Sequence, residues 1–239
     1  MKINRIKHRA LVTGGTRGIG LAIAERLVED GLDVISTGTK LNGNHTKGST
    51  YMQVDYLDSE SVKEFLKLID GQSIDVLVNN AGINKIDKFI EISEKDFDNI
   101  LQVNLKIPLL ISQLLVKHML SVNWGRVINI GSIFSKVSKE YRGSYSASKF
   151  ALDGLTAAMS AELANSNILV NTVSPGLIDT QLTRDVLGKL GIDNVKKSIP
   201  SKRLGQVDEI SSFVSWLVSE ENTYISGQNL TIDGGFTRV

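Results

Sequence analysis

The chain has no cysteine, only three prolines and few aromatic residues, which make up 6% of its 239 residues. Without cysteine there is no disulfide, no thiolate metal site and no cysteine nucleophile. The lack of cysteine also fits a reducing compartment. Since no Pro- or Ser-rich linker and no internal repeat divides the chain, we expect residues 1–239 to form one domain.

Neither sign of charge is in excess, because 27 Lys and Arg stand against 26 Asp and Glu. Such a balance provides no global field that attracts nucleic acid or anionic lipid. Long apolar runs are also missing: the start, MKINRIKHRALVTGG, reaches glycine after three apolar residues, whereas a signal peptide needs roughly 7–15. The longest apolar stretch, residues 107–120, contains Ser112, Gln113, Lys117 and His118, which indicates a buried helix rather than a membrane span. We expect a cytoplasmic protein with no nucleic-acid and no membrane partner.

The three histidines, His8, His45 and His118, are far apart and fit no metal-binding motif. We therefore expect no metal site and assign the histidines to loops, caps or the surface.

Short β-rich runs alternate with helical patterns along the whole chain. The runs begin at Ala10, Asp33, Tyr51, Asp75, Arg126, Ile168 and Asn229. They are mostly apolar rather than alternating, which is typical of parallel strands covered on both faces. The pattern predicts an α/β fold, namely a doubly wound (Rossmann) parallel sheet of about seven strands with helices on both faces. In such a sheet the ligand lies beyond the carboxyl ends of the strands.

The first run ends in TGGTRGIG, residues 13–20, directly before a helical pattern. Gly14, Gly18 and Gly20 permit a tight turn, and the helix N-terminus offers free amides to a pyrophosphate. The spacing is G-x-x-x-G-x-G rather than G-x-G-x-x-G, and a merely structural turn is the alternative.

The end of the second run determines which dinucleotide we expect. NAD sites usually carry an acid there, but this chain has Gly38. Arg17 and Lys40 are cations that can reach a 2′-phosphate, with hydroxyls from Thr37 and Thr39. Exposed loop cations are the alternative, but the balance favours NADP(H) as cofactor.

The later motifs carry a resemblance to a known family. After TGGTRGIG come NNAG (79–82), Asn104, Ser132, YSASK (145–149), PGLIDT (175–180) and a C-terminal DGG (233–235). In this order and over essentially the full length, the chain resembles the short-chain dehydrogenase/reductase family. The resemblance implies a homologous catalytic set of Asn104, Ser132, Tyr145 and Lys149.

The chemistry of this set follows from its residue types. Tyr145 and Lys149 are four residues apart and share one helix face. A nearby ammonium, together with an oxidised nicotinamide, is expected to lower the pKa of the Tyr145 phenol from near 10 so that it exchanges a proton with a carbonyl or alcohol oxygen. Ser132 would hydrogen-bond the same oxygen. Asn104, by resemblance, holds a water that links the lysine to solvent.

The resemblance also implies the cofactor contacts, with Asp55 at the adenine, Asn80 to Gly82 along the ribose and Thr180 at the nicotinamide amide. Tyr56 stands where an aliphatic residue is commoner, which weakens the adenine contact. The full set is Gly14, Thr16, Arg17, Gly18, Ile19, Gly20, Thr37, Lys40, Asp55, Asn80, Ala81, Gly82, Tyr145, Lys149, Pro175, Gly176, Ile178 and Thr180.

The resemblance further implies that the segment 181–204 folds over the site and shapes the substrate pocket. It holds six cations, Arg184, Lys189, Lys196, Lys197, Lys202 and Arg203, against Asp185 and Asp193. A solvated helix face and an anionic substrate explain this excess equally well.

Within the family the chain is most similar to 3-oxoacyl-[acyl-carrier-protein] reductases, through GRVINIGS, IPSKRLGQVDEI and ISGQNLTIDGG. That subgroup implies an acidic acyl carrier protein as partner, held by two arginines. Arg126 matches the first, but Ser166 occupies the second position. Reduction of a sugar or nucleotide-sugar ketone is the alternative, and a non-catalytic NADP-binding regulatory protein is the alternative from another class.

The helical patterns around residues 105–120 and 150–163 are apolar over more of their circumference than one sheet-facing stripe needs. In the family, two such helices from each subunit form a four-helix bundle. We therefore expect a homotetramer, or at least a dimer.

Overall fold

Seven parallel strands form one sheet in the order β3-β2-β1-β4-β5-β6-β7. The computed structural model describes residues 8–41 and 43–239. The strands are β1 (Arg9–Val12), β2 (Asp33–Gly38), β3 (Thr50–Gln53), β4 (Val76–Asn79), β5 (Gly125–Ile130), β6 (Ile168–Pro175) and β7 (Asn229–Ile232). All seven runs predicted from the sequence are strands, and the doubly wound parallel sheet is confirmed.

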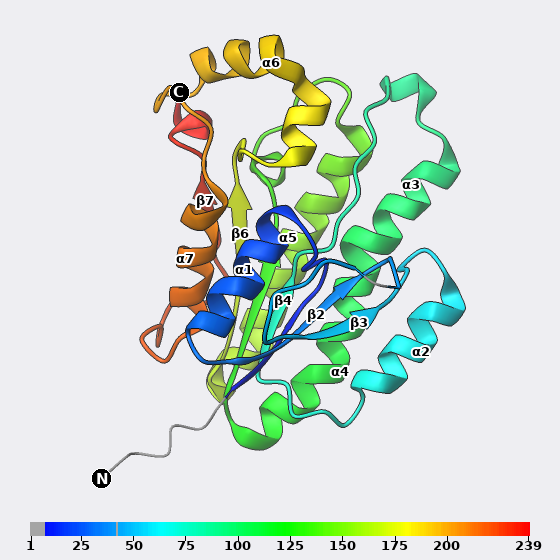
Figure 1. Cartoon of the computed structure of the whole chain (residues 1–239), viewed down its shortest axis with the longest axis vertical. Helices are drawn as coiled ribbons and strands as arrows, with labels where there is room; N and C mark the ends of the chain where they lie inside the picture. Colours follow the sequence, from blue (N-terminus) through cyan, green and yellow to red (C-terminus); the bar gives the residue numbers. More distant parts are fainter. Residues whose placement is uncertain (1–7, 42) are drawn as a thin grey trace.

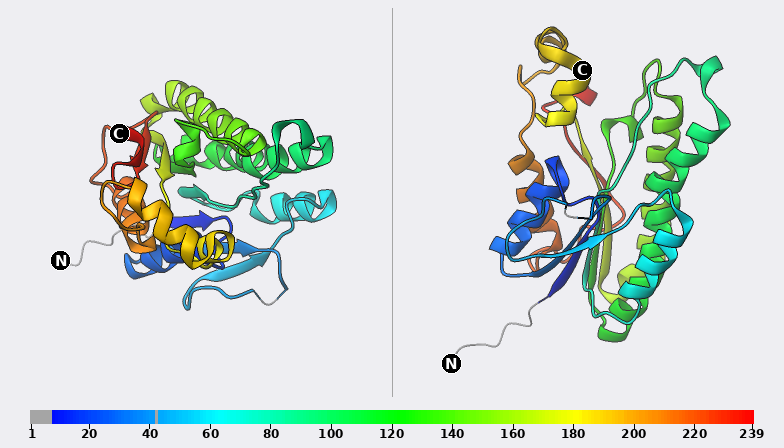
Figure 2. Two further views of the ribbon diagram at one scale, coloured as in Figure 1. Left: turned by 90° about the horizontal axis from the view of Figure 1, so that it is seen from above. Right: turned by 45° about the vertical axis from the view of Figure 1, so that its right-hand side comes forward.

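Helices cover both faces of the sheet, as Figure 2 shows. They are α1 (Gly18–Glu29), α2 (Ser59–Ile69), α3 (Glu94–Leu101), α4 (Ile107–Val122), α5 (Gly143–Leu163), α6 (Gln181–Ser198) and α7 (Val207–Val218). Helices α1 and α7 lie on one face, and α2, α4 and α5 lie on the other (Figure 1). Helix α6 lies at the carboxyl ends of the strands, where 181–204 was expected to cover the site.

Two apolar clusters fill the space between the sheet and these layers. One joins β1, β4 and β5 to α2 and α4, with Phe65, Ile111 and Leu115 at its centre. The other joins the same strands to α1 and α7, through Ile23 and Val214 among others. Because helices cover both faces of the central strands, every residue of β4 and β5 is buried.

A short π-helical segment, Gln102–Lys106, interrupts the run from α3 into α4. In the described part of the chain, this run, Glu94–Val122, is the helical stretch long and apolar enough to cross a membrane, with 44% of its most apolar window buried. It packs against β4 and β5 through Ile107, Ile111 and Met119, as a core helix does. A π-helical turn contains one residue more than an α-helical turn and so redirects the side chains that follow, and such turns are frequent at functional sites.

Helix ends fix the loops that surround the carboxyl edge of the sheet. Thr180 accepts a hydrogen bond from the Thr183 N–H at the start of α6. At the start of α7, Gln206 and Glu209 form a capping box. The strand order reverses direction between β1 and β4, so the loops after these two strands border the crevice in which doubly wound folds bind ligands.

Candidate active site

The glycine turn after β1 is tight because other backbone lies directly against it. Gly14 and Gly18 have φ angles of +67° and +54°, which favour glycine. A Cβ atom on Gly20 would lie 2.3 Å from the Gly14 carbonyl oxygen and from Nδ2 of Asn80. The turn therefore leaves its backbone amides open to a close ligand at the N-terminus of α1.

The NNAG segment after β4 holds this turn in place through hydrogen bonds. Nδ2 of Asn80 donates to the carbonyl oxygens of Thr13 (2.9 Å) and Gly14 (3.1 Å). In return, the Thr13 hydroxyl accepts from the N–H groups of Asn80 (2.9 Å) and Ala81 (3.0 Å). Sequence reasoning missed Thr13, whose only signal was its position directly before the glycines. The structure thus brings the two predicted cofactor segments into contact.

Thr37, expected at a 2′-phosphate, lies beneath the turn instead of at its surface. Its side chain is fully buried, accepts from the Gly14 N–H at 3.1 Å and is 3.0 Å from the Tyr56 hydroxyl. Burial raises the pKa of Tyr56, so that phenol stays protonated. In this arrangement Thr37 and Tyr56 support the turn from below.

The expected cations lie at the surface around the same turn. Arg17 is exposed at the N-cap of α1, and Lys40 is exposed just after β2. A Cβ at Gly38 would lie 2.5 Å from the Thr16 methyl carbon and 2.9 Å from the Tyr51 hydroxyl, so a side chain there would require these two side chains to shift. Asp55 is exposed farther along this edge and accepts from the Leu57 N–H at 2.9 Å.

The loop after β6 closes the other side of the turn. A Cβ on Gly18 would lie 3.5 Å from Cγ2 of Thr180, so these two segments are adjacent. Pro175 ends β6, and Gly176 lies so close to Asp233 that a Cβ would be 2.8 Å from its Cα. The Ile178 side chain is buried in the core cluster with α1 and α7, whereas Ile19 packs at the edge of that cluster.

The four expected catalytic residues converge beyond β4 and β5. Asn104, in the π-helical segment, donates to the Ile83 carbonyl (2.9 Å) and to Ser148 Oγ (3.0 Å) and accepts from the Ile83 N–H (2.9 Å). A Cβ on Gly82 would lie 3.3 Å from Asn104 Oδ1 and 3.7 Å from Lys149 Nζ. The ammonium of Lys149 donates to the Ile130 carbonyl at 2.7 Å and lies 5.7 Å from the centre of the Tyr145 ring.

Burial sets the protonation of this centre. Burial raises the pKa of Tyr145, opposed by a hydrogen bond with Ser132 and by the charge of Arg142. Burial also lowers the pKa of Lys149 to about 8. The hydrogen bond with Ser132 and the charge of Arg142 lower the pKa of the phenol but do not offset its burial, and the Lys149 ammonium donates to a backbone carbonyl. A lowering by Lys149 together with an oxidised nicotinamide stays a prediction.

A polar network behind Ser132 was not anticipated. The Ser135 hydroxyl donates to the Ser132 carbonyl at 2.6 Å and lies 2.9 Å from Ser174 Oγ. Asn229, from β7, accepts from Ser174 at 2.7 Å and donates to Ser135 at 3.0 Å. Three polar residues on different elements give no local pattern, so a single sequence could not reveal that they support Ser132.

The positive charge of 181–204 is partly neutralised by acids outside that segment. Arg184 pairs with Asp179 at 2.8 Å. Both terminal nitrogens of Arg203 donate to Glu209, at 2.8 and 2.7 Å. The excess of positive charge in 181–204, which suggested an anionic substrate, is therefore smaller on the surface of the folded protein.

Arg126 does not have the surface role that the resemblance implied. It is 2% exposed and donates to the carbonyls of Gly125, Asn167 and Asn222. Burial lowers its pKa to about 10. An arginine held in this way is not available at the surface, so the expectation that Arg126 holds a carrier protein is wrong.

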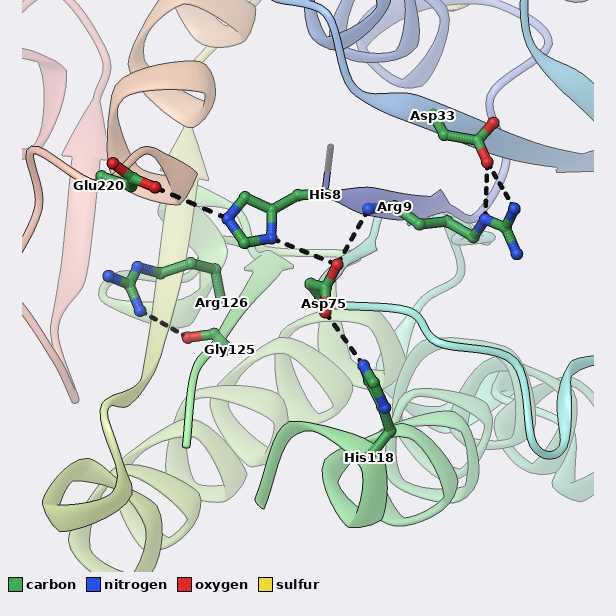
Figure 3. Close-up of polar contacts among 8 residues, drawn as sticks. All are labelled: His8, Arg9, Asp33, Asp75, His118, Gly125, Arg126 and Glu220. Atoms are coloured by element: carbon green, nitrogen blue, oxygen red, sulfur yellow. Dashed lines mark hydrogen bonds and ion pairs between the residues drawn. The ribbon is translucent and has the colours of Figure 1, made fainter. Parts of the chain in front are cut away.

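Two of the histidines are not isolated, as Figure 3 shows. Asp75, just before β4, lies 3.0 Å from Nε2 of His118 and 3.3 Å from Nδ1 of His8. This cluster is at the amino ends of the strands, opposite the candidate site. In the described residues no group of His, Asp or Glu is arranged to hold a metal ion.

Comparison with known proteins agrees with the fold and this geometry. A family model described as "Enoyl-(Acyl carrier protein) reductase" matches residues 14–237. The 3-oxoacyl-[acyl-carrier-protein] reductase FabG of Aquifex aeolicus is 38% identical over 242 residues, covering 95% of this chain and 96% of that protein. The same enzyme of Buchnera aphidicola is 36% identical over 246 residues, covering 98% of each.

Among solved structures, a gluconate 5-dehydrogenase from Burkholderia cenocepacia in complex with NADP and tartrate superposes with a TM-score of 0.89. It is 30% identical and covers 98% of this chain and 97% of that one. The chain therefore belongs to the short-chain dehydrogenase/reductase family. As a member it is an oxidoreductase that acts on CH–OH and C=O groups.

Proposed function

We propose that this chain is an NADP(H)-dependent oxidoreductase that interconverts a ketone and a secondary alcohol at Tyr145. The observation that carries the proposal is the convergence of Gly82, Asn104 and Lys149 next to Tyr145 and Ser132. This centre lies beside a glycine turn whose amides and close packing suit a dinucleotide pyrophosphate. NADP-bound solved neighbours support the choice of cofactor.

Each residue has a distinct task in this proposal. Ser132 donates a hydrogen bond to the carbonyl oxygen and holds it next to the phenol. The reduced nicotinamide supplies the hydride when it is bound. Tyr145 gives its proton to the same oxygen, so that the ketone becomes an alcohol and a phenolate remains. Lys149 stabilises that phenolate through its charge, and Asn104, which like Lys149 lies close to Gly82, holds a water through which the proton returns from solvent.

The first substrate candidate is a 3-oxoacyl thioester, as the names of the curated relatives suggest. The surface near the site favours an apolar chain. Phe89, near Gly143, is 84% exposed, the next residue Ile90 is 88% exposed, and Leu190 of α6 is 81% exposed. Figure 1 places both segments at the carboxyl end of the sheet. An acyl chain would cover these side chains.

The second candidate is a hydroxy acid of the gluconate type. Solved neighbours carry that name. The burial of Arg126 supports it, because the residue expected to hold a carrier protein is not available on the surface. A sugar-type substrate needs no protein carrier and therefore no such arginine.

The experiment is a turnover assay that follows NADPH absorbance with acetoacetyl thioesters, 5-keto-gluconate and small neutral ketones. Tyr145→Phe removes one hydroxyl and keeps the ring, so we expect turnover to fall at least about 10²-fold while NADPH affinity stays within about twofold. Glu162→Gln, at an exposed position of the same helix, is the control and should keep full turnover. If Tyr145→Phe retains normal turnover under conditions where chemistry limits the rate, another group donates the proton.

A further inference from the structure

Arg142 is a cation beside the proposed proton donor. It lies at the N-cap position of α5, three residues before Tyr145, and is half-buried. Its guanidinium carbon is 5.5 Å from the centre of the Phe134 ring, and that ring packs edge-on against the Tyr145 ring at 6.3 Å. The Phe134 N–H donates to the Ser132 hydroxyl at 3.2 Å. Arg142 thus belongs to the same cluster as the two groups that would hold the reacting oxygen.

The charge of Arg142 has no counterion within residues 8–41 and 43–239. Arg184 and Arg203 each pair with a carboxylate, but no Asp or Glu forms an ion pair with Arg142. Its Nε atom is shielded from solvent and has no hydrogen-bond partner. Burial lowers the pKa of Arg142, against an attraction to Tyr145. The shielded Nε donor thus has no acceptor, which is unfavourable, and the charge has no carboxylate beside it among the described residues.

We propose that Arg142 binds an anionic group of the substrate, a carboxylate or a phosphate, on the side of the reacting carbonyl that faces Phe134. The inference rests on the proposed ketone–alcohol reaction and narrows its substrate class to keto acids and keto phosphates. The planar guanidinium fork matches two oxygens of such a group at once. An uncharged 3-oxoacyl thioester would leave Arg142 unpaired, so the inference favours the second candidate over the first.

Arg142 could instead act only on the protonation of Tyr145, and the two roles predict different effects of its loss. If Arg142 acted only on Tyr145, its loss would slow charged and neutral substrates equally. If it binds the substrate anion, its loss raises KM for the charged substrate and leaves the neutral one nearly unchanged. Discrimination between matched charged and neutral compounds is therefore the decisive readout.

The test measures binding by calorimetry to the protein saturated with NADP. Tartrate is compared with dimethyl tartrate, and dihydroxyacetone phosphate with dihydroxyacetone, so that the two pairs separate a carboxylate from a phosphate. We expect the charged member of one pair to bind at least tenfold more tightly. Arg142→Gln should erase that preference, whereas Arg142→Lys should retain part of it, because lysine keeps the charge without the fork. KM values for reduction of dihydroxyacetone phosphate and dihydroxyacetone should follow the same order.

Lys139→Gln is the matched control, because Lys139 is an exposed cation on the same loop. It should keep the preference for the anion. The inference is overturned if neither pair shows a preference in the natural protein, if Arg142→Gln keeps it, or if Lys139→Gln loses it to the same extent.

Failure of the proposed reaction would look different, because binding is read without turnover. If no ketone leads to NADPH oxidation but the anion preference is present and depends on Arg142, the proposed reaction is refuted and the anion site is supported. The opposite outcome would be that neutral ketones are turned over equally by the natural protein and by Arg142→Gln, and that the natural protein shows no preference for anions. That result would support the reaction and refute the anion site.

Discussion

Lys149 is the residue of the proposed centre whose charge changes nearest to neutral pH. Burial lowers its pKa to about 8 and raises that of Tyr145 above the ordinary value near 10. Both shifts have the same cause, because a dry environment disfavours the ammonium as well as the phenolate. As the pH rises, the lysine therefore loses its proton before the tyrosine does.

This order predicts the pH dependence of ketone reduction. We expect kcat/KM to fall as the pH rises through about 8, because neutral Lys149 no longer stabilises the phenolate that forms at Tyr145. Lys149→Arg stays protonated over this range, so the fall should move to higher pH by at least about one unit. Steady-state rates at saturating NADPH, with NADPH affinity measured at each pH as the control, test this. A flat profile in the natural protein between pH 7 and 9.5 would contradict it.

At the scale of elements, the turn after β1 and the end of β2 form one unit for cofactor choice. The Gly14 N–H donates to the Thr37 hydroxyl, and a side chain at position 38 would require the Thr16 and Tyr51 side chains to shift. Position 38 therefore carries no acid to bind a ribose hydroxyl, as NAD sites usually do. Arg17 lies exposed at the head of α1, where a 2′-phosphate would meet it.

The geometry of this unit predicts a preference between the two dinucleotides. We expect NADPH to bind at least about tenfold more tightly than NADH, which corresponds to about 1.4 kcal/mol. Arg17→Ala should remove most of that difference, because a charge-assisted contact with the phosphate is lost while NADH has no such group. Fluorescence titration of both dinucleotides measures it. Lys47→Ala, at an exposed lysine beyond β2, is the control and should keep the preference; equal affinities in the natural protein would refute the prediction.

The strands and helices and their order along the chain were predictable from the sequence, because a buried parallel strand is a short apolar run that local composition reveals. The Tyr145–Lys149 spacing was equally local. What escaped prediction depends on tertiary contacts: the support of Ser132 by Asn229, the burial of Arg126 under three carbonyls, and the pairing of His8 with His118 through Asp75. Residues that meet only after folding leave no periodic signal, so their partners must be read from the structure.

At the scale of the whole molecule, α4 and α5 have surfaces that the sheet does not cover. Leu120, Val122 and Phe150 are 46%, 48% and 46% exposed. Along α5 the exposed positions also include small residues at three- and four-residue spacing, namely Ala147, Ala151, Gly154, Ala158 and Ala161. A face of small and apolar side chains lets a second helix approach closely, and when contiguous it marks an interface.

We therefore predict a homotetramer built on two-fold contacts between these helices, or at minimum a dimer. Light scattering at micromolar concentration should give a mass near four times 26.1 kDa. Gly154 offers a selective test, because nothing lies within 4 Å of a Cβ placed there and the backbone is helical. Gly154→Arg should leave each subunit folded, since arginine is the better helix former by roughly 1 kcal/mol, and should lower the mass by placing charge in the contact.

Glu25→Arg is the matched control for that variant. It introduces the same residue at an exposed position of α1, on the opposite face of the sheet. Because that face is not part of the predicted contact, its mass should equal that of the natural protein. A natural mass near 26 kDa would refute assembly altogether. An equal loss of mass in both variants would show that added charge, rather than the α5 face, disrupts the assembly.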